Sequence, residues 1–172
     1  MPHVLEIENA TSRFSWREED FLYYYRKTTD HQFKVVQYGD NIIAFAVYEV
    51  GQKEIHILNV AVRPTMQRRG IGMGIMEIIK KEFLYKGRNS MTIEVNEHNN
   101  GAIAFLAQYG FMGIRVLRNY YQSRLALEDG YLMRYSTNPT HVINRLRGHF
   151  AKLNEAREMF TGTPKLKNAF HQ

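Results

Sequence analysis

The 172-residue chain contains no cysteine. Disulfide bonds and a cysteine nucleophile are therefore excluded, and any group transfer by this chain proceeds without a protein thiol. The chain also lacks a run of 18 apolar residues and a basic segment followed by an apolar one, so we expect no membrane insertion, no secretion and a cytoplasmic location. Its histidines do not have the spacing of metal ligands, and we expect no metal site.

Acidic residues are fewer than basic ones, 17 against 23, which gives a formal net charge of +6. This excess favours anionic partners, such as the phosphates of a nucleotide or an RNA-rich particle like the ribosome, but ordinary surface solvation explains it equally well. The length suits one domain, and an apolar content of 44% is enough for a buried core.

Glycines are concentrated in one segment, 59–74, where an apolar strand runs into a basic turn that opens a helix. The first N–H groups of a helix have no partner within the helix, and the helix dipole makes this end attractive to anions. Glycine lets phosphate oxygens approach the backbone, and arginine adds charge. The segment therefore predicts a pyrophosphate site built from Arg68, Arg69, Gly70, Gly72 and Gly74.

The spacing of these glycines excludes two well-known phosphate loops. Neither G-x-x-x-x-G-K-[ST] nor G-x-G-x-x-G occurs. The motif that does occur is Gln-x-x-Gly-x-Gly, filled by Gln67, Gly70 and Gly72. Together with the strand before it and a helix through Lys86 that stops at Gly87, this motif resembles the acetyl-CoA motif of the GNAT acyltransferase superfamily.

The rest of the chain alternates short strands with helices. We expect a helix after Ser15, with Ser15 as N-cap and Glu18 in the reciprocal capping position. Another helix is expected over 99–109, and strands over 33–37, 42–50, 54–62, 91–95, 111–118 and 130–135. A mixed, mostly antiparallel sheet with helices on both faces makes residues 1–136 a single α/β domain.

Residues 137–172 are predicted to form a separate extension. Apolar residues recur there at helical spacing, which predicts a basic amphipathic helix over 139–160 followed by a flexible basic tail. Docking of this helix on the domain or on a second subunit is the favoured interpretation. Contact with RNA, as on the ribosome, is the alternative.

Glu94 is the candidate for catalysis. It lies between Ile93 and Val95 in an expected strand, so its side chain projects away from two apolar neighbours. A carboxylate placed in this way can take a proton from an amine, directly or through water. A solvent-facing glutamate or a structural ion pair would give the same pattern. His56, within another expected strand, is interpreted as a core residue rather than a catalyst.

Several motifs together resemble one family within the GNAT superfamily, the bacterial ribosomal-protein alanine N-acetyltransferases. The chain also looks like the catalytic subunits of archaeal and eukaryotic N-terminal acetyltransferases. The resemblance covers roughly residues 4–135 and implies a GNAT fold. Its motifs, in the family's order, are Trp16…Phe21, 59–87, 94–103, Gly110-Phe111, 118–121 and 128–133.

The resemblance implies a role for each matching position. Glu94 matches the general base, and Tyr120 and Tyr121 match a pair that lines the slot for the first residues of the acceptor. The implied contacts with acetyl-CoA are the backbone of a strand beside pantetheine, the turn around the pyrophosphate, and one asparagine on the pantetheine arm: Val60, Ala61, Val62, Gln67, Arg68, Arg69, Gly70, Ile71, Gly72, Met73 and Asn99.

One position departs from the family pattern. In the bacterial family a tyrosine on the helix after the Asn99 position protonates the leaving thiolate, and this chain has Leu106 there. Tyr109 lies three residues later but matches a core leucine, so we expect it to pack rather than to donate a proton. The general acid is therefore unassigned.

These features predict an enzyme that moves acetyl from acetyl-CoA to an amine by direct transfer in a ternary complex. The expected acceptor is the α-amino group of a protein or peptide N-terminus. Its pKa of about 7.7–8.0, against about 10.4 for lysine, means that it needs only mild help from Glu94. Two alternatives remain: acetylation of a small amine such as a polyamine or an antibiotic, and a non-catalytic acyl-CoA-binding or assembly subunit.

Overall fold

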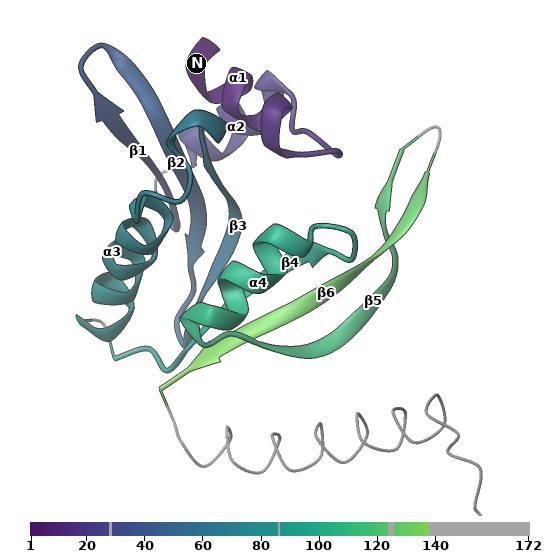
Figure 1. Ribbon diagram of the computed structural model, residues 1–172. Coiled ribbons are helices and arrows are strands. Elements are labelled where there is room, and N and C mark those ends of the chain that lie inside the picture. Colours follow the sequence, from purple (N-terminus) through teal and green to yellow (C-terminus); the bar gives the residue numbers. More distant parts are fainter. Residues whose placement is uncertain (28, 86, 124–125, 138–172) are drawn as a thin grey trace, which may run out of the picture. The chain divides into compact units, whose positions relative to one another are not determined.

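The structure, a computed structural model, describes residues 1–27, 29–85, 87–123 and 126–137. Within these residues, six strands form one sheet in the order β1-β2-β3-β4-β6-β5 (Figure 1). β3 and β4 are parallel, and every other neighbouring pair is antiparallel, which confirms the predicted mixed sheet. The strands are β1 (His31–Tyr38), β2 (Asn41–Val50), β3 (Glu54–Val62), β4 (Ser90–Asn96), β5 (Met112–Gln122) and β6 (Leu127–Ser136).

Four α-helices accompany the sheet in this part of the chain: α1 (Pro2–Thr11), α2 (Glu18–Arg26), α3 (Ile71–Tyr85) and α4 (Asn100–Tyr109). Helix α1 was not predicted from the sequence. None of the described helices combines the length and the apolar character that a membrane span needs. The amphipathic helix predicted over 139–160, the tail after it and Lys86 lie outside the described residues.

The start of α2 corrects one prediction. Its N-cap is Arg17, two residues after the predicted Ser15, and the backbone N–H of Arg17 donates to Asp20 at 2.8 Å. Asp20 thus takes the reciprocal position that was assigned to Glu18. The hydroxyl of Ser15 instead donates to the carbonyl of Ser12 at 2.9 Å, inside the loop that joins α1 to α2.

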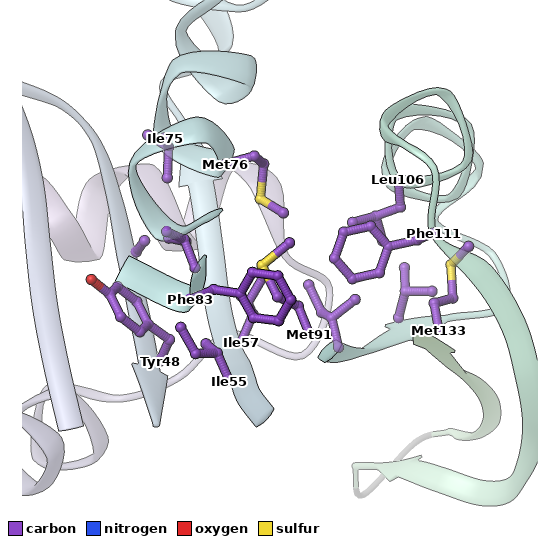
Figure 2. Close-up of a cluster of buried hydrophobic side chains, with 14 of the residues drawn as sticks. Tyr48, Ile55, Ile57, Ile75, Met76, Phe83, Met91, Leu106, Phe111 and Met133 are labelled. Atoms are coloured by element: carbon purple, nitrogen blue, oxygen red, sulfur yellow. The ribbon is translucent and has the colours of Figure 1, made fainter. Parts of the chain in front are cut away.

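The core lies on both faces of the sheet because successive residues of β2 point to opposite sides. Phe45 and Val47 pack with residues of α1 and α2, whereas Ala46 and Tyr48 belong to the cluster under α3 and α4. Figure 2 shows this second cluster, in which Leu106 of α4 lies beside Phe111 and Met133. The predicted placement of helices on both faces is confirmed.

The sheet opens between its two parallel strands. β3 and β4 are paired only from Glu54↔Ser90 to Ile57↔Ile93. Beyond this point β3 pairs only with β2, and β4 only with β6. Leu58 has no partner in either neighbouring strand, because the register between β2 and β3 shifts there. The sheet therefore divides at the carboxyl ends of two parallel strands, a place where α/β proteins bind ligands.

Candidate active site

A cavity of about 830 Å³ lies where β3 and β4 separate. Its walls are the ends of these two strands, the turn before α3, helix α4, and the end of α1 with the loop after it. No group of three metal-ligating side chains occurs in the described part of the chain. The cavity is lined by twelve of the residues predicted to form the site: Val60, Ala61, Val62, Gln67, Arg68, Gly70, Ile71, Gly72, Met73, Glu94, Asn99 and Tyr121.

Three predicted residues, Arg69, Gly74 and Tyr120, do not line this cavity. All three are exposed: Arg69 in the turn before α3, Gly74 in the first turn of α3, and Tyr120 on the β5–β6 hairpin, where half of its surface is accessible. The sequence could not separate Arg69 and Tyr120 from Arg68 and Tyr121, because adjacent residues of a turn or strand point in different directions.

The turn before α3 presents backbone N–H groups to the cavity. Arg68 has a φ of +61°, uncommon for a residue with a side chain, and Gly70 has a φ of +80°. Gln67 holds the turn against the end of β3, since its side-chain amide donates to the carbonyl of Val62 at 3.0 Å. Above Gly70 no atom lies within 4 Å of where a Cβ would stand. The turn thus has open space at Gly70, directly before a helix start whose first N–H groups have no partner within the helix, which is the arrangement of an anion site.

Gly72 has a packing role as well as the predicted one. A Cβ at this position would lie 3.3 Å from the ring of Phe105, so glycine allows α3 to approach α4 closely. Asn99 forms the N-cap of α4, where its side-chain oxygen accepts the N–H of Ala102 at 3.1 Å. Asn99 also lines the cavity.

Glu94 forms a close pair with His56. The Nε2 atom of His56 and the Oε2 atom of Glu94 are 2.5 Å apart, and both side chains are mostly buried. The hydrogen bond to Glu94 raises the pKa of His56 above its usual range, against the opposing effect of burial. The sequence left the partner of His56 open, and the structure places it beside Glu94, the candidate for catalysis. Only the parallel register, which sets His56 opposite Thr92, could have revealed this contact.

The loop between α1 and α2 meets the β5–β6 hairpin across one end of the cavity. The rings of Phe14 and Tyr121 are 5.5 Å apart, and Arg13 forms an ion pair of 2.6 Å with the buried Glu128. Tyr121 lies over Gly130, where a Cβ would come within 3.0 Å of the ring. Burial raises the pKa of Tyr121, so its hydroxyl stays protonated near neutral pH. The loop and Tyr121 line the same cavity as Glu94, and the part of the cavity that they border is called the slot.

Helix α4 offers no tyrosine to the cavity. Leu106 lines the cavity and is only 2% exposed, and its side chain belongs to the core beneath α4 (Figure 2). Tyr109 packs against Tyr135, and its hydroxyl donates to Glu77 at 2.8 Å. The packing role predicted for Tyr109 agrees with these contacts.

Comparison with known proteins gives one family. Residues 1–111 match the profile of the acetyltransferase (GNAT) family. The chain is 31% identical over 139 residues to the [ribosomal protein bS18]-alanine N-acetyltransferase of Salmonella typhimurium, covering 77% of this chain and 88% of that protein. The crystal structure of the ribosomal-protein-S18-alanine N-acetyltransferase from Escherichia coli matches with a TM-score of 0.69 and 28% identity, over 78% of this chain and 86% of that one.

A more distant structure shares the fold. It is Arabidopsis thaliana Naa50 in complex with the bisubstrate analogue CoA-Ac-MVNAL, with a TM-score of 0.65 and 16% identity over 77% of this chain and 89% of that one. The fold, the glycine turn and these matches agree, and the chain belongs to the GNAT family as an N-acetyltransferase.

Proposed function

We propose that this N-acetyltransferase moves the acetyl group of acetyl-CoA to the α-amino group of a protein or peptide N-terminus, by direct attack in a ternary complex. The observation that carries the proposal is that one cavity is lined by the turn before α3, by Glu94 with His56 behind it, and by Phe14 and Tyr121 of the slot. Both substrates can then meet at Glu94. The relative from Salmonella typhimurium carries the name of an alanine N-acetyltransferase of a ribosomal protein, which supports this acceptor class.

The residues around the cavity fit acetyl-CoA. The N–H groups of the first turn of α3, with Arg68 beside them, would hold the pyrophosphate. Among the described residues, no strand pairs with the end of β3 on its cavity side, so the backbone of Val60 to Val62 would pair with the amides of the pantetheine arm. Asn99 would contact the same arm from α4.

Glu94 would act as the general base. It takes a proton from the acceptor ammonium, and the neutral amine attacks the thioester carbonyl. A C–N bond forms, the attacking nitrogen then gives its remaining excess proton to water, and the C–S bond breaks, which leaves an acetylated amine and the thiolate of CoA. His56 holds the Glu94 carboxylate in place through the contact between its Nε2 atom and Oε2 of Glu94. An α-amine lies about 2.5 pKa units below a lysine, which saves about 3.4 kcal/mol of deprotonation.

The walls of the slot favour a chain end over an internal lysine. The Arg13–Glu128 ion pair and the Phe14–Tyr121 contact join the loop to the hairpin across the slot. A polypeptide that passed through in both directions would have to break these contacts, whereas a free N-terminus can enter from one side. A small amine would fit as well, so the acceptor must be tested directly.

The test is a peptide assay read by mass spectrometry. The chain is incubated with acetyl-CoA and peptides that differ in their first residue, beginning with alanine. Matched controls are the same peptides with a blocked N-terminus and an internal lysine, and spermidine as a small amine. We expect acetylation of the free α-amine only. Higher kcat/KM for the blocked lysine peptide or for spermidine would contradict the proposal.

A further inference from the structure

Glu8 is a buried carboxylate that the proposed chemistry does not use. It lies near the end of α1, lines the cavity, and is only 1% exposed. Its two oxygens bind two different parts of the site. Oε1 accepts the backbone N–H of Trp16 at 2.9 Å, and Oε2 accepts the side-chain amide of Asn59 at 3.1 Å.

Trp16 and Asn59 belong to the two parts of the site that would hold the two different substrates. Trp16 lies in the loop of residues 12–17, which also carries Arg13 and Phe14 to the acceptor slot. Asn59 lies on β3, directly before the segment that would pair with pantetheine. Glu8 is therefore the link between the wall of the acceptor slot and the strand beneath the acetyl group.

The link is made at a cost in folding free energy. Burial raises the pKa of the Glu8 carboxyl, because an ionised carboxylate loses its hydration inside the protein. An apolar residue would pack α1 against the sheet without this cost, as Val4 and Ile7 do on the same helix. A carboxylate is needed only if two donors, one on each element, must be held at fixed positions.

We propose that Glu8 is a positioning residue that fixes the loop of residues 12–17 relative to β3, and so sets where the acceptor amine lies with respect to the acetyl group. The inference rests on the proposed function for the identity of these two substrates. The contact of Glu8 with the loop can be tested without knowing the acceptor.

The first test compares Glu8→Gln with Glu6→Gln. Glu6 lies one half-turn away on α1, is mostly exposed, and forms an ion pair with Arg63 outside the cavity. For Glu8→Gln we expect the KM of the acceptor peptide to rise about tenfold, with the KM of acetyl-CoA changed by less than about threefold. Glu6→Gln should leave both unchanged. An equal rise in both KM values for Glu8→Gln would mean that Glu8 only supports the fold, and would overturn the proposal.

The double variant Glu8→Gln with Asn59→Asp tests whether the contact can be restored. Asn59→Asp alone sets two carboxylates against each other and should weaken acceptor use more than Glu8→Gln does. In the double variant the new amide donates to the new carboxylate, so the contact is restored with its polarity reversed. We expect the double variant to recover most of the acceptor KM. Failure to recover, with a folded protein, would count against a positioning role.

Trp16 supplies a readout that needs no acceptor. It is the only tryptophan in the chain, and its ring stacks on Tyr24 at 5.0 Å. Glu8→Gln should make its fluorescence more accessible to acrylamide quenching, and Glu6→Gln should not. Unchanged quenching in Glu8→Gln would overturn the proposal. If the wild-type protein acetylates no peptide, the proposed function fails, and the quenching comparison alone decides whether Glu8 fixes the loop.

Discussion

His56 and Glu94 meet at the point where β3 and β4 stop pairing, with 2.5 Å between Nε2 and Oε2. Because Glu94 is the main cause of the raised pKa of His56, Glu94→Gln should lower that pKa. Glu54 is a smaller contributor, so Glu54→Gln should lower it much less. The measurement is an NMR titration of the His56 ring. A similar fall in both variants would mean that the close pair does not form in solution.

The same contact has a consequence for stability. A histidine with a raised pKa in the folded state stabilises the fold below its unfolded pKa of about 6.5, and this contribution is lost as the pH rises through the folded pKa. The difference in unfolding free energy between wild type and His56→Gln should therefore shrink as the pH rises from about 6.5 through the folded pKa of His56. Urea unfolding at a series of pH values checks this, and a gap that widened with pH would contradict it.

Glu94→Gln should retain acetyl-CoA binding and lower turnover by about 10² or more, because the amide keeps the shape of the side chain but cannot accept the proton. The loss should be greatest at low pH, where more of the acceptor amine is protonated. Steady-state rates and a binding assay measure the two effects separately. Turnover at the wild-type rate would show that water or another group removes the proton.

Arg68 and Arg69 should differ in their effect on acetyl-CoA binding, since only Arg68 lines the cavity. A ligand at 100 times its Kd stabilises the native state by about 2.7 kcal/mol, which is a clear rise in Tm. We expect Arg68→Glu to remove most of this rise and Arg69→Glu to remove less. If acetyl-CoA leaves the wild-type Tm unchanged, the turn before α3 does not bind it.

Tyr121 and Tyr120 provide a second matched pair. Tyr121→Ala removes the ring that contacts Phe14, so the KM of the acceptor peptide should rise while that of acetyl-CoA stays nearly constant. Tyr120→Ala should have a smaller effect, because Tyr120 does not line the cavity. A rise of both KM values in Tyr121→Ala would assign the hairpin a structural role instead.

Leu106→Tyr tests whether a general acid is absent. A thiol with a pKa near 8.5 leaves tolerably well as a thiolate, so we expect the wild type to be active but slow. A phenol at this position should raise kcat, since general acid catalysis contributes about 10²–10⁴-fold, at a packing cost of about 1–3 kcal/mol. Tyr109→Phe should leave kcat unchanged, because that hydroxyl is bonded to Glu77. A fall of 10² in kcat for Tyr109→Phe would identify Tyr109 as the donor.

The sequence was informative where a local pattern is sufficient to define a structure. The strand β3 has the predicted bounds. The turn after it was recognised because its backbone conformation is determined by a few adjacent residues, its glycines and arginines. Helix α1 was missed because its N-cap, Met1, makes no side-chain capping hydrogen bond, Pro2 is its one start signal, and the helix is held by the packing of Val4 and Ile7 against the sheet. Packing of this kind depends on residues distant in the sequence.

The candidate site shows the same contrast between what a local pattern predicts and what depends on residues distant in the sequence. Glu94 was found from its place between two apolar residues of one strand. Its partner His56 is 38 positions away, and the partners of Glu8 are 8 and 51 positions away. These contacts depend on the register between strands and on the path of a loop, neither of which a single sequence without an alignment determines.

The opening of the sheet gives the molecule two three-stranded halves that are joined by four residue pairs. His56 and Glu94 lie next to the last of these pairs, at the closed end of the opening between β3 and β4. When two plates flex about a common edge, points near that edge move least. Motion of the two halves about these pairs would thus widen the outer parts of the opening and leave His56 and Glu94 almost stationary.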